Sequence, residues 1–388
     1  HIDHSGLLPK LTRAGFKGPI HATAATVELL GVMLPDSAHI QESEARRSAK
    51  RFRGKRPMEP IYALQDAREC LTQANSVAYD QEFSPHATVR CRFRDAGHIL
   101  GSAIIEVWVT EHGRATKLVF SGDLGQPGRP ILRDPTLIEE TDILVVESTY
   151  GDRRHLDLAA TEDEMIAIVE KTLYERGGNV IMPAFAVGRT QQVIYLLHRL
   201  ACEGRLRPPK VFVDSPMATE ATRITREHLE LFDEEARRLA GWQAQGKDIP
   251  YLRFTASVEE SMALNRIRSG AIVISASGMC DAGRIRHHLR HNLPRKECSV
   301  LMPGFQAQRT LGRRLVDGAT RVRIFDEDIP VRAAIHSVDG LSAHADQAAL
   351  LDWAGAFRKP PAHTFVVHGE SSAALAFAET LRQKLGWH

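Results

Sequence analysis

The chain begins with His1-Ile2-Asp3-His4-Ser5-Gly6, and this segment carries its strongest chemical signal. Two imidazoles and one carboxylate lie within four residues, and both groups bind divalent metals such as zinc, manganese or iron. The spacing matches the second half of an H-x-H-x-D-H motif, whose first histidine does not lie in this sequence. We therefore interpret the chain as starting within a motif that serves two adjacent metals, and we look for supporting ligands elsewhere.

The composition predicts a globular protein of two domains. The chain has 388 residues, of which 43% are hydrophobic and 25% charged, so it can bury two cores. No run approaches the roughly eighteen apolar residues of a spanning helix, and we expect no membrane association. The five cysteines are scattered and never spaced C-x-x-C. That pattern argues against a disulfide framework or a zinc ribbon and favours the cytoplasm.

Short β-branched runs that end in polar or glycine-rich turns predict an α/β fold. The runs are 118–120, 143–146, 211–213, 272–274 and 365–367. Continuous apolar runs of this length are typical of strands covered on both faces. Because α/β folds place reactive groups at the C-terminal ends of their strands, the residues that follow these runs are candidate site residues.

Helical segments alternate with these runs. Thr161 and Glu164 form a capping-box pattern at the start of an apolar helical stretch that Gly177-Gly178 closes. A second helix is expected after Gly188. The region from about 160 to 330 is therefore predicted to form its own β-α-β layered unit.

Three further residues with metal-binding side chains follow expected strands. His98 follows the strand-like segment 89–93, Asp123 follows 118–120 within Ser-Gly-Asp, and His368 follows 365–367. Taken singly, each residue is better explained in an ordinary way: His98 as a core histidine, Asp123 as a turn or helix-cap acid, and His368 as a turn donor. Together, and in this order, they favour a metal site shared with the N-terminal segment.

Six segments of the chain resemble, in the same order, motifs of the metallo-β-lactamase superfamily in its β-CASP branch of nucleases. They are His1 to Gly6, Gly97-His98-Ile99-Leu100-Gly101-Ser102, Ser121-Gly122-Asp123, Glu147-Ser148-Thr149-Tyr150-Gly151, Ser342-Ala343-His344-Ala345-Asp346 and Val367-His368-Gly369-Glu370. The chain most resembles the bacterial relatives of the mRNA 3′-end cleavage nuclease. The resemblance implies an αββα sandwich, N-terminally incomplete here, over residues 1–158 and 335–388, with an inserted β-CASP α/β domain over 159–334.

The resemblance also implies a site for two divalent metals, usually zinc. Its ligands would be His1 and His98 for one metal, Asp3, His4 and His368 for the other, and Asp123 bridging both. Two metals held about 3.5–4 Å apart activate a water and clamp phosphoryl oxygens. In the family the histidine at His344 is the general acid. Glu147 would orient that imidazole, with a strand-end cap as its ordinary explanation, and Asp3 could assist in deprotonating the water.

Three loops are candidates for substrate binding, although small residues after a strand are often only tight turns. The residues we single out in them are Arg189, Ser275, Ser277, Gly278, Arg284 and Arg309. Backbone amides and arginines at such places can meet a phosphate. The family tends to have glycine where Arg309 stands, so the backbone approach there is expected to differ.

The net charge of +2 excludes a polycation that binds nucleic acid by bulk attraction, but two basic runs stand out. They are Arg46, Arg47, Lys50, Arg51, Arg53, Lys55 and Arg56, and then Arg284, Arg286, Arg290, Arg295 and Lys296 among His287, His288 and His291. A solvated face is the ordinary explanation, and a groove for a phosphate backbone is the alternative. For the three histidines we expect a basic helix face instead of a metal site.

These expectations lead to a metal-dependent ribonuclease, cleaving internally, from an end, or both, with RNA as its partner. The alternatives are a DNA nuclease of the same fold and a catalytically inactive RNA-binding scaffold subunit. DNA enzymes of the family typically have valine where His368 stands, which favours RNA, and the retained ligands argue against the scaffold. A small-molecule hydrolase would lack the inserted unit. Whether the protein forms a homodimer stays open.

Overall fold

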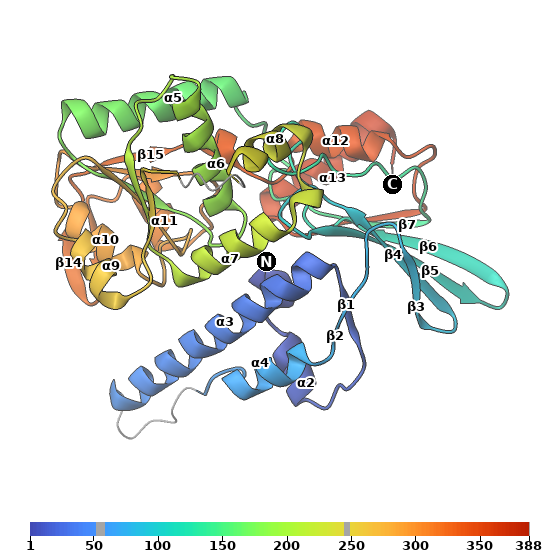
Figure 1. Cartoon of the computed structure of the whole chain (residues 1–388). Helices are drawn as coiled ribbons and strands as arrows, with labels where there is room; N and C mark the ends of the chain where they lie inside the picture. Colours follow the sequence, from blue (N-terminus) through green and yellow to red (C-terminus); the bar gives the residue numbers. More distant parts are fainter. Residues whose placement is uncertain (52–58, 244–248, 388) are drawn as a thin grey trace.

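The computed structural model describes residues 1–51, 59–243 and 249–387. Within them the strands form two six-stranded sheets and two two-stranded ones. Figure 1 shows the green-to-orange segments gathered on one side of the molecule and the teal and red segments on the other, with the N-terminus between them.

The first six-stranded sheet joins the early part of the chain to its C-terminal part. In spatial order its strands are β16 (His363–Val366), β7 (Ile143–Val146), β6 (Arg114–Phe120), β5 (Ala103–Glu111), β4 (Val89–Asp95) and β3 (Glu82–His86). β16 runs parallel to β7, and β7 runs parallel to β6, while β3 to β6 form an antiparallel meander. The loops that follow β6, β7 and β16 therefore meet at one edge.

The second six-stranded sheet is entirely parallel. Its order is β10 (Leu252–Phe254), β9 (Lys210–Val213), β11 (Ala271–Ser275), β8 (Val180–Pro183), β12 (Ser299–Met302) and β15 (Ala334–Ser337). Every residue of β8, β11 and β12 is buried, as expected for strands covered on both faces.

The same expectation of two-sided cover is wrong for β16. Its residues alternate between exposed and half-buried, and Phe365 is 54% exposed. The cause is one-sided packing: helices α12 (Gln347–Gly355) and α13 (Ser371–Leu385) cover the face that carries Leu144 and Val146. Phe365 lies on the other face because side chains alternate along a strand.

The predicted helices form, with one corrected boundary. α6 (Arg189–Cys202) follows Gly188 as expected. α5 (Leu158–Glu170) begins one turn before the predicted Thr161 start, because the Asp157 carboxylate accepts hydrogen bonds from the amides of Ala159 and Ala160 and caps the helix there. A π-helical turn, η1 (Lys171–Glu175), extends it toward the predicted stop at Gly177-Gly178.

A long helix not foreseen from the sequence, α3 (Ala24–Arg51), runs alongside α7 (Pro216–Glu227), as Figure 1 shows. Leu29, Leu30 and Met33 of α3 share a buried core with Ala221 and Ile224 of α7. The helix thereby ties the N-terminal segment to the second sheet's helices. Of the first basic run, Arg53, Lys55 and Arg56 lie outside the described residues.

The remaining elements are short. They are α1 (Ile2–Ser5), α2 (Leu8–Arg13), β1 (Ile20–Ala22), α4 (Leu64–Leu71), β2 (Ala74–Ser76), η2 (Leu229–Leu231), α8 (Glu234–Gln243), α9 (Val258–Leu264), α10 (Ile285–Asn292), α11 (Leu311–Val316), β13 (Arg321–Ile324), β14 (Glu327–Pro330) and η3 (Asp339–Leu341). Among the helices described, none is long and apolar enough to cross a bilayer. All five cysteines are free thiols.

Candidate active site

Five of the six predicted metal ligands, from three distant segments, converge on the sixth, Asp123. One carboxylate oxygen of Asp123, Oδ1, lies 3.2 Å from Nε2 of His4 and 3.3 Å from Nδ1 of His368. The other, Oδ2, lies 3.7 Å from Nε2 of His98. Burial by itself raises the pKa of Asp123, but the hydrogen bond from His4 and the surrounding histidine rings hold that pKa well below its usual range. Asp123 therefore remains an anion among imidazoles.

His1, His98 and Asp123 form the first ligand group, with donor atoms all within 4.8 Å of one another. His98 is 3% exposed, and neither of its ring nitrogens has a hydrogen-bond partner of normal geometry among the described residues. Burial lowers the pKa of His98 well below its usual value, which keeps the ring in the neutral form that binds a metal. Burying an imidazole without hydrogen-bond partners costs free energy, and a metal cation bound to a ring nitrogen would offset that cost.

Asp3, His4 and His368 form the second ligand group, again with donor atoms within 4.8 Å. The Nε2 atoms of His4 and His368 face each other at 3.2 Å, and Nε2 of His368 lies 3.3 Å from Oδ2 of Asp3. The hydrogen bond to Asp3 raises the pKa of His368 to about 9. Burial raises the pKa of Asp3, but His368 and His4 outweigh it and bring that pKa to about 2. A divalent cation bound here would replace the proton that His368 shares with Asp3, so the donor atoms of both groups fit a divalent cation.

Two glycines let these segments approach. A Cβ on Gly125 would lie 2.0 Å from the carbonyl oxygen of Gly97, so only glycine lets the loop that carries Asp123 pass next to the loop that carries His98. A Cβ on Gly369 would lie 2.4 Å from Oγ of Ser148. That hydroxyl donates to the carbonyl of Val367 at 2.8 Å and fixes the backbone that presents His368.

His344 lies beside the two ligand groups and pairs with a buried acid. Its Nδ1 is 3.2 Å from both carboxylate oxygens of Glu147, and its ring centroid is 4.2 Å from that of His98. Glu147 also accepts from the amides of Leu124 and Thr149, so its position is fixed by the backbone. Burial lowers the pKa of His344, but the Glu147 carboxylate more than offsets this and raises it above the usual value.

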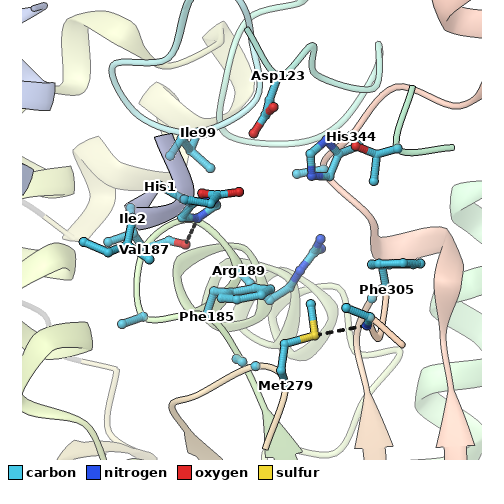
Figure 2. Close-up of a pocket in the computed structure, with 18 of the residues that line it drawn as sticks. His1, Ile2, Ile99, Asp123, Phe185, Val187, Arg189, Met279, Phe305 and His344 are labelled. Carbon is cyan, nitrogen blue, oxygen red and sulfur yellow. Dashed lines mark hydrogen bonds between the residues drawn. The ribbon is translucent and has the colours of Figure 1, made fainter. Parts of the chain in front are cut away.

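A cavity of about 690 Å³ extends from this cluster between the two sheets. Figure 2 shows Asp123 and His344 on one side, Phe185 and Met279 on the other, and the Arg189 side chain rising between them. Burial lowers the pKa of Arg189 to about 10, so its guanidinium stays charged at neutral pH. Tyr150 acts in the opposite direction and raises that pKa, and no carboxylate of the described residues forms an ion pair with this guanidinium.

Comparison with known proteins places this geometry in a family. A model of the β-CASP domain matches residues 190–315, and one of the zinc-dependent metallo-hydrolase RNA specificity domain matches residues 328–388. Ribonuclease TTHA0252 of Thermus thermophilus is 35% identical over 385 residues, which cover 98% of this chain and 82% of that relative. The chain belongs to the β-CASP branch of the metallo-β-lactamase superfamily. The resemblance identified from the motifs is confirmed, as is the metallo-β-lactamase fold with an inserted β-CASP domain.

Two archaeal β-CASP relatives from Methanocaldococcus jannaschii also match along this chain. Transcription termination factor FttA is 28% identical over 99% of the chain, but the chain spans only 59% of that factor's length. An RNase J-like protein is 27% identical over 99% of the chain and is covered over 83% of its own length.

The six residues predicted to bind substrate in this β-CASP protein separate into two sets. Arg189 and Gly278 line the cavity. Ser275 and Arg284 instead bind Asp214: Ser275 Oγ donates to its carbonyl at 2.8 Å, and Arg284 Nη1 donates to its carboxylate at 2.8 Å. These two residues serve the fold, because a fully buried carboxylate needs such donors.

The other two predicted residues lie outside the cavity lining. Oγ of Ser277 accepts from the amide of Ala282 within its own loop. Arg309 is exposed and has a φ of 70°, a left-handed conformation that favours glycine. The backbone expected for a family glycine is therefore retained, although an arginine occupies it.

The basic face expected on α10 is retained at His287 and His291, which are exposed, but the expectation is wrong for His288. His288 is 1% exposed and its Nε2 lies 2.6 Å from Oδ2 of Asp214, so it belongs to the buried network. Arg290 pairs with Glu327, and the Arg286 guanidinium stacks over Phe325. These cations already have partners because β14 and the turn before it pack alongside the helix.

The sequence did not reveal the apolar side of the cavity or the buried hydrogen-bond network around Asp214. Phe185, Met279 and Phe305 line the cavity, together with Met33 from α3. Asp214 directly follows β9, and that strand-end position was the signal that could have marked it. The apolar residues gave no such signal, since a phenylalanine after a strand is usually a core residue.

Proposed function

We propose that this protein is a metal-dependent ribonuclease that hydrolyses RNA phosphodiester bonds. The observation that carries the proposal is the convergence of five metal-binding side chains on the Asp123 carboxylate beside a cavity, with buried His98 lacking hydrogen-bond partners among the described residues. Membership of a family whose matched domain is named for zinc-dependent hydrolysis and RNA specificity supports it, as does the name of the ribonuclease relative.

We further propose that the site holds two divalent ions, with zinc as the native metal. His1, His98 and Asp123 would hold one, and Asp3, His4 and His368, with Asp123, the other. Each group offers at least three protein ligands, the number typical of catalytic zinc sites that keep a position open for water or substrate. Divalent ions bound in this way supply an activated water and offset charge on phosphoryl oxygens.

His344 is the residue we assign as general acid. Its Nδ1 side is occupied by Glu147, so its Nε2 is the atom that would give a proton to the leaving ribose oxygen. Glu147 holds the ring in place and favours its protonated form, while Asp3, ionised near neutrality, would accept a proton from the attacking water. Acid and base are thus separate groups.

Arg189 is the residue we assign to a substrate phosphate. A charged guanidinium inside a cavity and without a carboxylate partner is suited to an anion, and its planar fork matches phosphate oxygens. Gly278 lines the same cavity and would contribute its backbone to the substrate site, while the Phe185 ring occupies the space that a side chain would fill. We also propose the domain limits 1–158, 159–334 and 335–388, and a cytoplasmic location, which the five free cysteines fit.

The test is cleavage of one sequence supplied as 5′- and 3′-labelled RNA and as the matching single-stranded DNA, with and without chelator. We expect metal-dependent cleavage of the RNA, and the product ladders distinguish internal from terminal cleavage. Faster cleavage of the DNA would instead identify a DNA nuclease. Tight RNA binding with no bound metal and no cleavage would identify a scaffold subunit.

A further inference from the structure

Phe185 is an aromatic side chain left open in the wall of the cavity. It follows β8, and 39% of its surface is exposed although it lines the pocket beside the ligand cluster. Isolated exposed apolar residues on an outer surface need no explanation, but Phe185 lies in the same cavity as the metal ligands and Arg189, where a bound ligand can cover it. Exposing this apolar ring to water costs free energy, and a ligand stacked on the ring would offset that cost.

The backbone around Phe185 holds the ring rigidly. The amide and the hydroxyl of Thr190 both donate to the Phe185 carbonyl, at 3.1 and 2.8 Å. Behind the ring, a Cβ on Gly278 would lie 2.9–3.1 Å from ring carbons, so the ring packs directly on that glycine's backbone. The His1 ring lies beside it with a centroid distance of 5.5 Å. A rigid, supported ring loses little entropy when it binds a partner.

The position of the ring relative to the charged groups indicates what stacks on it. Phe185 precedes Arg189 by four residues, both residues line the cavity, and Figure 2 shows both side chains below the ligand cluster. On the opposite wall, Phe305 already packs on Tyr150 and beneath Arg153. A cation next to an open aromatic face is the pairing that binds single-stranded nucleic acids, where the phosphate meets the cation and the base stacks on the ring.

We propose that Phe185 is a stacking platform for one unpaired nucleobase whose neighbouring phosphate binds at Arg189. This pair of residues selects single-stranded RNA, because a base inside a duplex is already stacked between its neighbours and cannot cover the Phe185 ring. It accepts any base, since every base has a flat face. This proposal rests on the proposed function, because it assumes that RNA occupies the cavity.

The test compares binding of oligouridine with binding of a ribose-phosphate strand of equal length that lacks bases, measured in chelator so that nothing is cleaved. Stacking of one base is worth about 1–3 kcal/mol, so the natural protein should bind oligouridine about 5–150-fold more tightly than the abasic strand. Phe185→Leu should lose most of that preference and bind the abasic strand as the natural protein does. Phe185→Tyr should keep it, which also reports on folding.

Tyr174→Leu is the matched control, because Tyr174 is 40% exposed but lies outside the cavity lining. It should retain the full preference. An unchanged preference in Phe185→Leu, equal binding of duplex and single strand, or no RNA binding would each overturn the proposal. Because no metal or cleavage enters this assay, failure of the ribonuclease assignment would appear separately, as base-dependent binding without hydrolysis.

Discussion

Nδ1 of His344 lies 3.2 Å from both carboxylate oxygens of Glu147, and the same ring stacks 4.2 Å from His98. An imidazole that is held by an acid on one side and borders the ligand cluster on the other is arranged to donate a proton from its remaining nitrogen. Asp123, Glu147 and His344 also have potential donor atoms within 4.8 Å of one another, but we assign His344 to proton transfer because Glu147 already engages its Nδ1.

His344→Ala should therefore lower the rate of RNA cleavage by about 10²–10⁴-fold, the usual contribution of a general acid. The loss should be much smaller for a phosphodiester with a p-nitrophenolate leaving group, which departs without a proton. Single-turnover rates on both substrates, together with the metal content of the variant, check this. Equal losses on the two substrates would show that His344 does not act as the acid.

Asp123→Asn should remove both activity and metal. Asp123 belongs to the first ligand group and also lies 3.2–3.3 Å from His4 and His368 of the second, so its charge serves both sites. Metal analysis after dialysis and a cleavage assay measure the loss. Asp352→Asn, an exposed acid on α12, is the control and should behave as the natural protein. Unchanged metal content and rate in Asp123→Asn would refute the bridging role.

Asp214→Ala should destabilise the protein by about 3–5 kcal/mol, the usual cost of removing one partner of a buried charged network. The Asp214 side chain is fully buried and accepts from Thr255, Ser261, Arg284 and His288. The free energy of unfolding from denaturant melts measures the effect. A loss below about 1 kcal/mol would mean that the network contributes little to stability.

His228 should make stability depend on pH. Burial lowers its pKa, but hydrogen bonds with Glu230 and with Glu28 of α3, at 2.9 and 3.0 Å, outweigh burial and raise it. A pKa raised in the folded state stabilises fully below the unfolded value near 6.5 and loses that contribution as pH rises through the folded value. His228→Gln should therefore destabilise more at pH 6 than at pH 9, by less than about 1 kcal/mol because the acids are exposed.

Melting temperatures at the two pH values measure this effect. His363→Gln, at an exposed strand position, is the control and should change stability little at either pH. A His228→Gln effect that is equal at pH 6 and pH 9 would contradict a contribution from the charged ring.

The ligand cluster could be predicted from the sequence because His1, Asp3 and His4 lie in one short motif, and His98, Asp123 and His368 lie in short motifs that follow strands. His98, Asp123 and His368 are each located by a turn of one or two glycines, which the sequence displays locally. The partners of Arg284 and Ser275 could not be predicted, since Asp214 lies 61 to 70 residues away and is reached only through the parallel pairing of β9 with β11. Local sequence patterns reveal which loops follow strands, but they do not reveal which side chains from different loops contact one another.

The helix α3 and the exposure of Phe365 illustrate the same limit. The charges near the end of α3 suggested a surface run, while its apolar residues, such as Leu29 and Met33, are buried against α7. The run 365–367 looked like a fully covered strand, but packing covers one face of β16. Both depend on which neighbours pack against the element, and the sequence of the element does not contain that information.

The most direct test of the central claim is RNA cleavage by chelator-treated protein as zinc is added back. If six side chains form two ion sites around Asp123, cleavage should be absent without metal and should saturate at two equivalents of zinc per chain. Cleavage that proceeds unchanged in excess chelator would contradict the account, and so would bound RNA that stays intact at every zinc concentration.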